Sequence, residues 1–428
     1  MPPLVGEGSS AASLGADAFR QIARTALAAV RAGARVLAVV SDRTRDDNTD
    51  VLFPIVSEEL RRLGAARFDA LIAQGTHPPM RDEQKREKIG ADLAEIPLLG
   101  QIFDHHWDRS SELTMIGTLT GDRVSALTGG LIDEPVPVTV NARLGPGTYD
   151  AIIVMGATVP HEVAGFAGGA KYFFPGVAGP ELTHRTHWLG ALATIKRVIG
   201  RIETPTRRMI EAAADFVTAP VIAFTSVSTR RGGALRTHAL FAGDLRETVR
   251  RAAAVSGQVH VRYTGRRYRR VVALLDRHYD ELWVGGKASY KLGSIIETGG
   301  ELIIYAPHLT QISATHGRLI EKYGYAPLEQ VREMVETSDE LRANLCIAAH
   351  LAHVSFAGHR DALGNIGPRY RITMATGISE ETCRKVNLGY LDHRTFAVKN
   401  YEGDPDTLIV QDAGRDLYLV QPAEDEQA

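Results

Sequence analysis

The sequence predicts an α/β fold of two domains, each with a mainly parallel sheet flanked by helices. Three observations support this prediction. The chain has 428 residues, more than one hydrophobic core ordinarily holds. Short continuous apolar runs alternate with amphipathic segments of helical spacing, as in parallel sheets buried on both faces. Hydrophobic residues make up 44% of the chain and its formal charge is −2, a composition typical of globular proteins.

The first half of the chain carries the clearest alternation. The pattern predicts, in order, a helix over 18–31, a strand over 35–40, a helix over 56–64, a strand over 68–73, a charged helix over 81–90 and a buried strand over 151–156. Ligands of such sheets bind beyond the carboxyl ends of the strands. The chemically distinctive residues of this half follow such ends, which predicts a binding site there.

A second α/β unit begins near residue 270. Its expected elements are strands over 271–275, 281–284 and 301–305, a helix over 288–297, and strands over 407–410 and 417–420. The boundary lies between about 255 and 275, so we assign residues 1–265 to the first domain and 266–428 to the second. The active site is expected in the cleft between them.

Composition also excludes several classes of protein. The two cysteines, Cys346 and Cys383, are far apart and form no CxxC, which argues against a disulfide scaffold and fits a reducing cytoplasm. The N-terminal residues suggest no secretory signal, and no apolar run is long enough for a membrane span, so we expect a cytoplasmic protein. Arginines and tyrosines alternate over 262–270, but in a slightly acidic chain this favours a solvated face over nucleic-acid binding.

Residues 160–176 are the most informative segment. His161 and Lys171 are ten residues apart across small residues that include Gly168 and Gly169, and His187 follows the lysine by sixteen. Small residues let a backbone approach a ligand closely, and a lysine between imidazoles can hold a cofactor by covalent and metal bonds. The alternative is a glycine-rich turn with a surface lysine and a hydrogen-bonded histidine.

The segment PHEVAGFAGGAKYFFPG resembles the motif PHFFAGFSGGRK(x)3PG of the nickel-dependent lactate racemase family. The resemblance implies that Lys171 carries a nickel-pincer nucleotide, pyridinium-3,5-bisthiocarboxylic acid mononucleotide, along the bend at Gly168 and Gly169. It makes His187 the nickel ligand, with His184 as the local competitor, and His161 an acid/base on the substrate hydroxyl.

Two further motifs support this resemblance. Asp42 and Arg45 match the family's DxTR, whose aspartate and arginine lie at the substrate, with the arginine near its carboxylate. Without the resemblance, these two residues would indicate an aspartate that caps the N-terminus of a helix and a nearby surface arginine. The run beginning Gly75-Thr76-His77 resembles GTHRPM, with Pro78 in place of the arginine, so Thr76 and His77 are expected at the cofactor phosphate. The histidine could instead cap the following helix.

Two more site residues come from weaker matches. The family's second acid/base histidine aligns with His105, although His106 beside it leaves that assignment uncertain by one residue. Lys287 aligns with a lysine that helps to hold the substrate carboxylate when the second domain closes. The family's YQxxK is here Trp283-Val284-Gly285-Gly286-Lys287, which puts lactate itself in doubt as the substrate. The resemblance runs from about residue 18 to 300.

The resemblance implies a racemase or epimerase of a 2-hydroxy acid, with 1–265 as cofactor-binding domain and 266–428 closing over the substrate. Hydride transfer to the tethered cofactor avoids a carbanion, and two histidines handle the hydroxyl proton. The substrate could be lactate, a larger hydroxy acid or an aldonate, and separate biosynthetic proteins would load the cofactor. The alternatives are an enzyme with pyridoxal phosphate as a Schiff base on Lys171, and a non-catalytic protein that binds small acids or nucleotides.

Overall fold

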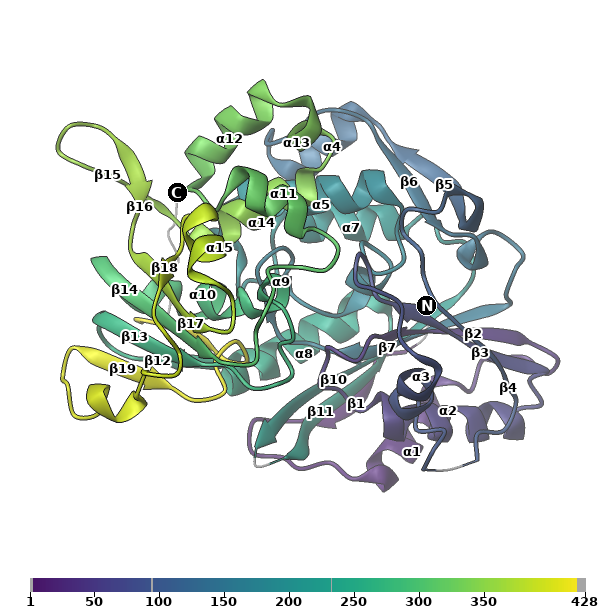
Figure 1. The fold of residues 1–428 in the computed structure, drawn as a ribbon. Helices are drawn as coiled ribbons and strands as arrows, with labels where there is room; N and C mark the ends of the chain where they lie inside the picture. The colour runs from purple at the N-terminus through teal and green to yellow at the C-terminus, as the bar shows by residue number, and fades with distance from the viewer. Residues whose placement is uncertain (1–2, 94, 232, 422–428) are drawn as a thin grey trace. The chain divides into compact units, whose positions relative to one another are not determined.

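The computed structural model describes residues 3–93, 95–231 and 233–421 (Figure 1). The chain forms two compact units. The first comprises the chain up to Leu189 together with Gly200–Val259, and the second comprises Gly190–Ile199 and the chain from His260 onward. The α/β class predicted from the sequence is confirmed, because both units contain a largely parallel sheet flanked by helices.

The first unit holds the seven-stranded sheet. Its elements are β1 (Val5–Gly8), α1 (Ala16–Ala26), β2 (Arg35–Ser41), α2 (Thr49–Arg62), β3 (Arg67–Ala73), α3 (Asp82–Lys88), β4 (Leu99–Phe103), β5 (Leu113–Leu119), α4 (Gly121–Thr128), β6 (Val136–Asn141), β7 (Ala151–Ala157), β8 (Pro160–His161), β9 (Gly165–Phe166), the 3₁₀ helix η3 (Gly169–Tyr172), α5 (Pro180–Leu192, whose last turn belongs to the second unit), α7 (Pro205–Ala214), β10 (Val221–Arg231), β11 (Ala234–Gly243) and α8 (Leu245–His260).

Strand order in this sheet is β1-β11-β10-β7-β2-β3-β4. The five strands from β10 to β4 are parallel, whereas β11 and β1 are antiparallel additions at one edge. The chain runs outward from β2 through β3 to β4, and from β7 outward to β10 on the other side. The order therefore reverses between β2 and β7, and such a switch point is where open α/β sheets bind ligands.

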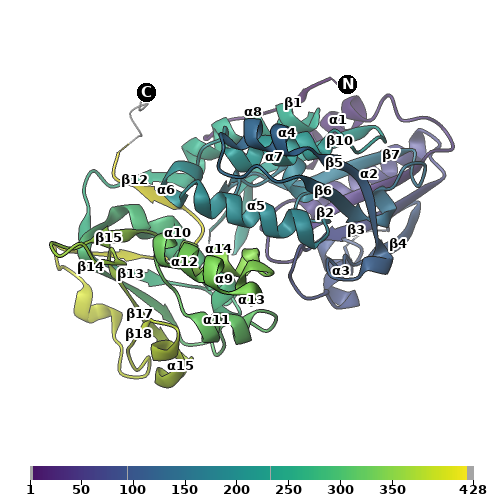
Figure 2. The same ribbon diagram turned by 90° about the horizontal axis from the view of Figure 1, so that it is seen from above.

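Successive side chains of each strand point to opposite faces of the sheet and pack into two separate hydrophobic cores. Val36 and Val40 of β2 face α1 and α2 in one cluster, in which Phe53 stacks on Phe68 with ring centroids 4.4 Å apart. Leu37 of the same strand faces the other way, into a cluster shared with α5, α7 and η3. Figure 2 shows α5 and α7 over that face. Burial on both faces explains why β2 and β7 are continuous apolar runs rather than alternating ones.

The second unit contains a five-stranded sheet of order β18-β17-β14-β13-β19, all parallel. Its elements are α6 (Ile195–Val198), β12 (Val261–Tyr263), β13 (Tyr268–Leu274), α9 (Leu282–Gly285), α10 (Lys287–Leu292), β14 (Ile296–Ala306), α11 (Gly317–Tyr323), α12 (Leu328–Thr337), α13 (Asp339–Arg342), α14 (Leu345–Ser355), β15 (Gly358–Arg360), β16 (Ile366–Pro368), β17 (Arg371–Thr376), α15 (Glu380–Lys385), β18 (Gly389–Tyr390), β19 (Thr407–Val410) and β20 (Leu417–Leu419).

One predicted strand is wrong. Residues 281–284 contribute to the short helix α9, because β14 pairs directly with β13 and leaves no place between them for another strand. The N–H groups of Leu282 and Trp283 instead donate to the loop carbonyls of Gln311 and Ile312. A four-residue apolar run fits a strand or a buried helical turn equally well, so periodicity could not decide.

The helix predicted over 288–297 is also too long. Its α-helical part, α10, ends at Leu292, and strand β14 already begins at Ile296. Within the described residues, no helix combines the length and the apolar character that crossing a bilayer would need.

Candidate active site in the N-terminal unit

Four loops that carry predicted site residues leave the carboxyl ends of four neighbouring strands. Asp42 follows β2, His77 lies in the turn after β3, His105 is two residues beyond β4, and His161 follows β7. Because these strands are adjacent and parallel, their ends meet along one edge of the sheet. The switch point between β2 and β7 lies within this set, so the topology alone gathers these side chains.

The loop after β2 is organised by Asp42, which is buried. Its Oδ1 accepts hydrogen bonds from the backbone N–H of Thr44 (2.9 Å) and from the Thr44 hydroxyl (2.6 Å). Its Oδ2 lies 2.6 Å from Nδ1 of His77. Burial would raise the pKa of Asp42, but the His77 ring, the Arg45 guanidinium and the Thr44 hydroxyl hold it well below its ordinary value. The carboxylate therefore stays ionised at neutral pH.

Arg45 is partly buried, and its guanidinium forms no hydrogen bond or ion pair with the part of the chain that the structure describes. Its backbone is fixed instead: Nζ of Lys88 donates to the Arg45 carbonyl (3.2 Å) and to the Asp47 carboxylate (2.7 Å). A guanidinium on an anchored loop, with its donors uncommitted, suits a carboxylate ligand.

The turn after β3 links three of the loops. Gly75 has φ +57°, and its N–H donates to the Gly176 carbonyl at 2.9 Å. The Gln74 side chain donates to the backbone carbonyl of His105, also at 2.9 Å. Thr76 follows in this turn, partly buried. The predicted phosphate contacts of Thr76 and His77 stay predictions, but the turn does place them beside the segment that follows Lys171.

Gly168 and Gly169 are required by packing. Both have positive φ, +95° and +61°. A Cβ on Gly168 would lie 2.5 Å from the Thr158 hydroxyl, and one on Gly169 would lie 2.8 Å from the Leu245 carbonyl. The bend is thus pressed against the residue that follows β7 and against α8, and a larger residue would push the following lysine out of place.

A buried arginine that was not among the predicted site residues holds this bend. Arg207 of α7 is fully buried, and its two terminal nitrogens donate to the carbonyls of Phe166 and Gly168. Burial lowers its pKa to about 10, which leaves the guanidinium charged at neutral pH. The signal available in the sequence was the cluster of charges in 203–211, inside an otherwise amphipathic helix.

Lys171 lies in η3 and is partly buried, and within the described residues its side-chain amine forms no hydrogen bond or ion pair. Burial, together with the positive charge of Arg45, lowers its pKa to about 7, while Glu162 and Asp42 act in the opposite direction and Arg207 adds to the lowering. About half of the amine is therefore neutral at pH 7. A neutral, partly buried amine is a nucleophile that a reagent can reach, which is what covalent attachment of a cofactor requires.

His161 is buried, and the Val163 N–H donates to its Nδ1 at 3.1 Å. The Glu162 carboxylate lies 3.6 Å from the same nitrogen. Because an N–H group can only donate, the neutral ring carries its own proton on Nε2. His161 is thus arranged to donate a proton from Nε2, and it must release that proton before Nε2 can accept one.

The two neighbouring histidines after β4 differ in environment. His105 is 1% exposed; its Nε2 donates to the Ala178 carbonyl (3.0 Å), and Asn141 lies 3.4 Å from its Nδ1. Burial lowers its pKa to about 4. His106 is partly exposed, with Nδ1 2.9 Å from the Glu112 carboxylate. A carboxylate-oriented imidazole is the usual acid/base arrangement, so hydrogen bonding favours His106, whereas His105 has the contacts of a structural histidine.

His187 lies in α5, and its Nδ1 donates to the Thr183 carbonyl at 2.7 Å. The neutral ring then keeps its lone pair on Nε2, the tautomer that a metal ligand needs. His184 packs edge-on against Trp107, with centroids 5.7 Å apart, and burial lowers its pKa. Across the described residues, no three side chains of His, Cys, Asp or Glu gather to hold a metal ion.

Lys287, the one predicted site residue in the second unit, begins α10 after the carboxyl end of β13. Its Nζ lies 5.6 Å from the centre of the Tyr279 ring. Nearby, Trp283 stacks between His316 and His350, with centroids 4.4 and 4.1 Å away. The predicted role of Lys287 at a substrate carboxylate stays a prediction.

Residues 18–198 match the family model described as the lactate racemase N-terminal domain. Among curated relatives, lactate racemase from Thermoanaerobacterium thermosaccharolyticum is 30% identical over 154 residues, which cover 36% of this chain and 32% of that protein. Lactate racemase from Lactiplantibacillus plantarum is 26% identical over 175 residues, which cover 41% of this chain and 35% of that protein. The matched stretch thus spans about a third of the length of these curated relatives.

Two solved structures are similar over nearly the whole chain. A protein from Thermotoga maritima is 30% identical with a TM-score of 0.87, covering 95% of this chain and 98% of that one. The lactate racemase apoprotein from T. thermosaccharolyticum gives a TM-score of 0.70 at 17% identity, covering 94% of this chain and 92% of that one. At that identity the second likeness shows the shared fold alone.

Proposed function

The chain belongs to the lactate racemase family, and from this premise we propose that it is a racemase or epimerase of a 2-hydroxy acid. It would work with a nickel-pincer nucleotide attached to Lys171. The environment of that lysine supports the proposal: it is a partly buried amine whose pKa is lowered to about 7 by burial and by Arg45. It lies on a glycine bend next to the switch point of the sheet.

The residues present fit this cofactor. Lys171 offers a neutral amine for the covalent bond, and His187 keeps an imidazole lone pair on Nε2 for the metal. A single protein ligand suffices when the cofactor supplies the other donors. When bound, the cofactor would supply an electron-poor pyridinium ring and so the capacity for hydride chemistry at the substrate carbon.

The chain's own residues would bind the substrate and move its hydroxyl proton. Arg45 pairs with the carboxylate, since its donors are uncommitted and its loop is anchored by Lys88. The Asp42 carboxylate orients His77 and balances the positive charge around the site. Lys287 would add a second cation at the substrate carboxylate.

The hydroxyl proton must leave and return for C2 to invert. His161 takes it once its own Nε2 proton has been released, and gives it back on reversal. On the opposite face the second acid/base is His105 or His106. His106 has the carboxylate partner, whereas His105 would have to give up its bond to Ala178. A buried imidazole with a pKa of about 4 is a weak base at neutral pH.

The proposal is tested by co-expression with cofactor-making proteins, followed by intact mass, nickel content and a chiral assay on 2-hydroxy acids, aldonates included. We expect a mass adduct on Lys171, about one nickel per chain, and interconversion of one pair of stereoisomers. No adduct and no nickel, from a host that loads a known racemase, would contradict the proposal.

A lysine Schiff-base enzyme is the second candidate, because a low lysine pKa also favours imine formation. The same mass measurement separates the two. A Schiff base with pyridoxal phosphate is retained only after borohydride reduction, and it brings no nickel. Binding of small acids without turnover would instead support the non-catalytic reading.

A further inference from the structure

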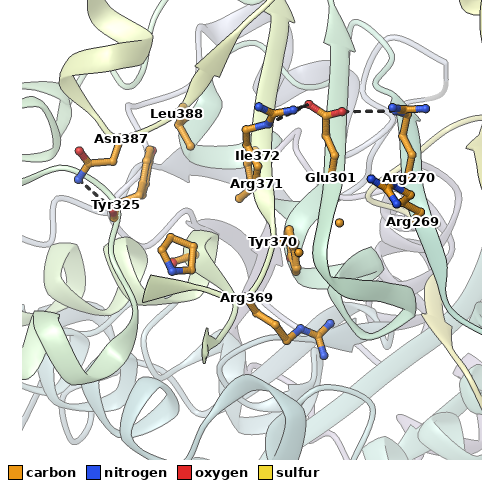
Figure 3. Close-up of a pocket in the computed structure, with 14 residues that line it drawn as sticks. Arg269, Arg270, Glu301, Tyr325, Arg369, Tyr370, Arg371, Ile372, Asn387 and Leu388 are labelled. Carbon is orange, nitrogen blue, oxygen red and sulfur yellow. Dashed lines mark hydrogen bonds and ion pairs between the residues drawn. The ribbon is translucent and has the colours of Figure 1, made fainter. Parts of the chain in front are cut away.

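The second unit contains a cavity of about 510 Å³ that none of the residues discussed above explains (Figure 3). It lies where β13, β14 and β17 begin, and its lining includes Arg269, Gly300 and Arg369. All strands of this sheet are parallel, so the cavity is at their amino-terminal edge. Lys287 follows the carboxyl end of β13, at the opposite edge. The cavity is therefore separate from that lysine.

The lining is strongly positive. Four arginines, at 269, 270, 369 and 371, face one carboxylate, Glu301, which leaves a net of three positive charges. Glu301 lies between Arg270 (3.4 Å) and Arg371 (2.9 Å), as Figure 3 shows, and it also accepts a hydrogen bond from the Thr373 hydroxyl (2.7 Å). Arg270 has a second acidic partner in Asp404, which lies 3.7 Å away and outside the lining. The arginines of the lining that have no acidic partner within the described residues are therefore Arg269 and Arg369.

Arg369 is the buried member of the set, only 8% exposed. One terminal nitrogen donates to the carbonyls of Gly293 and Ile296, so the side chain is held in place. Its Nε has no hydrogen-bond partner, and no carboxylate pairs with it within the described chain. Arg269 is exposed and likewise forms no ion pair there. A fixed, buried guanidinium without a counter-charge is costly unless an anion joins it.

The remaining wall is apolar. Tyr325 and Tyr370 are buried, and their hydroxyls are hydrogen-bonded to His350 (3.4 Å) and Ser289 (3.0 Å). They therefore offer ring carbon to the cavity, together with Leu388. A cavity of several hundred Å³ with an apolar wall and a few convergent charged groups is typical of small-molecule sites.

We propose that this cavity binds a small organic anion with at least two negative charges, a phosphate ester or a polycarboxylate. Its charged groups pair with Arg269, Arg369 and Arg371, and its carbon frame lies against Tyr325 and Tyr370. The inference does not depend on the proposed racemase activity. It also gives a role to part of the arginine-rich run at 262–270, whose Arg262 is instead paired with Asp416 at 2.9 Å.

Isothermal titration of the full-length protein with ADP, citrate and adenosine tests this. ADP or citrate should bind, adenosine should not, and the two anions distinguish phosphate from carboxylate recognition. Arg269→Gln and Arg371→Gln should each weaken binding about tenfold, as expected for the loss of one charge-assisted hydrogen bond. Arg332→Gln, an exposed arginine of α12 outside the cavity, should leave binding unchanged.

A site in the first unit is excluded with Arg45→Gln, which should not alter this binding. The proposal is overturned if neither anion binds at millimolar concentration, if adenosine binds as well as ADP, or if Arg45→Gln weakens binding while the cavity variants do not. Tighter, Arg269-dependent binding of a single-stranded oligonucleotide would also overturn it, in favour of a nucleic-acid surface.

Discussion

Oδ2 of Asp42 lies 2.6 Å from Nδ1 of His77, which joins the loops that follow two adjacent parallel strands. With Nδ1 engaged by a carboxylate, Nε2 becomes the nitrogen that can bind a ligand or exchange a proton. The sequence placed Asp42 at the substrate and His77 at the cofactor phosphate as separate contacts. Their pairing makes them one unit, so changing either alters the other.

Asp42→Asn should destabilise the protein by about 2 kcal/mol at pH 7, because it removes a buried charge partner of His77 and Arg45. The native pKa of Asp42 lies below the unfolded value of about 3.9. The stabilisation that ionised Asp42 gives to the folded protein is therefore complete above the unfolded pKa and is lost progressively as the pH falls below it. Urea unfolding of both proteins at pH 7, 5 and 3 measures the difference, which should shrink only at pH 3.

Asp17→Asn is the matched control, because Asp17 pairs with Arg20 on the exposed surface of α1. It should change the free energy of unfolding little at any pH. A difference for Asp42→Asn that stays constant down to pH 3 would mean that the pair does not set the ionisation of Asp42.

Lys171 should react with amine reagents at neutral pH in the apoprotein. With a pKa of about 7, the neutral fraction of its amine rises about tenfold between pH 6 and 8 and is then nearly complete. The neutral fraction of an ordinary lysine, by contrast, still rises up to about pH 10. Peptide mass spectrometry after brief acetylation at several pH values gives this profile for Lys171. Arg45→Gln should move its midpoint upward, because Arg45 contributes to the low pKa. Labelling that still rises beyond pH 9 would refute the assignment.

Strands and their ends were predictable because β2, β7 and all of β3 but its Asp69 are apolar runs buried on both faces, a signal that needs no tertiary information. Hydrogen bonds between distant loops and helices could not be predicted from the sequence in this way. Nothing local in the sequence indicates that Arg207 reaches the carbonyls of Phe166 and Gly168, about forty positions earlier. Such contacts depend on how helices pack over a sheet, which the residues around Arg207 do not specify.

The tautomer of His187 makes it the expected nickel ligand. In protein loaded with the cofactor, His187→Ala should lose most of its nickel while the mass adduct on Lys171 remains. His184→Ala, three residues away on the same helix, is the control and should retain its nickel. Metal analysis beside intact mass separates the two readouts, and the reverse pattern would transfer the role to His184.

Measurements of unfolding free energy and of turnover rate together decide whether His105 or His106 is the second acid/base. His105→Ala should destabilise the protein by about 2 kcal/mol, because it removes the hydrogen-bond partner of the Ala178 carbonyl and of the Asn141 side-chain nitrogen. His106→Ala should unfold nearly as the parent does, yet lower turnover in one direction by about a hundredfold. If His105→Gln, which keeps a donor, still loses activity without losing stability, His105 is the acid/base instead.

The bend before Lys171 should be intolerant of any side chain. Gly168→Ala forces an alanine to φ +95° and brings its Cβ to 2.5 Å from the Thr158 hydroxyl, which should cost about 3 kcal/mol through strain and overpacking. Gly257→Ala is the control: its Cβ would meet nothing within 4 Å in the helix α8, so it should be neutral or stabilising. Adding Thr158→Ala to Gly168→Ala removes the nearest atom. This second substitution should restore the stability lost through overpacking but not the stability lost through backbone strain. The double variant should therefore lose less free energy of unfolding than the two single variants lose together. Full additivity would show that Thr158 does not confine the bend and that only the backbone conformation requires glycine.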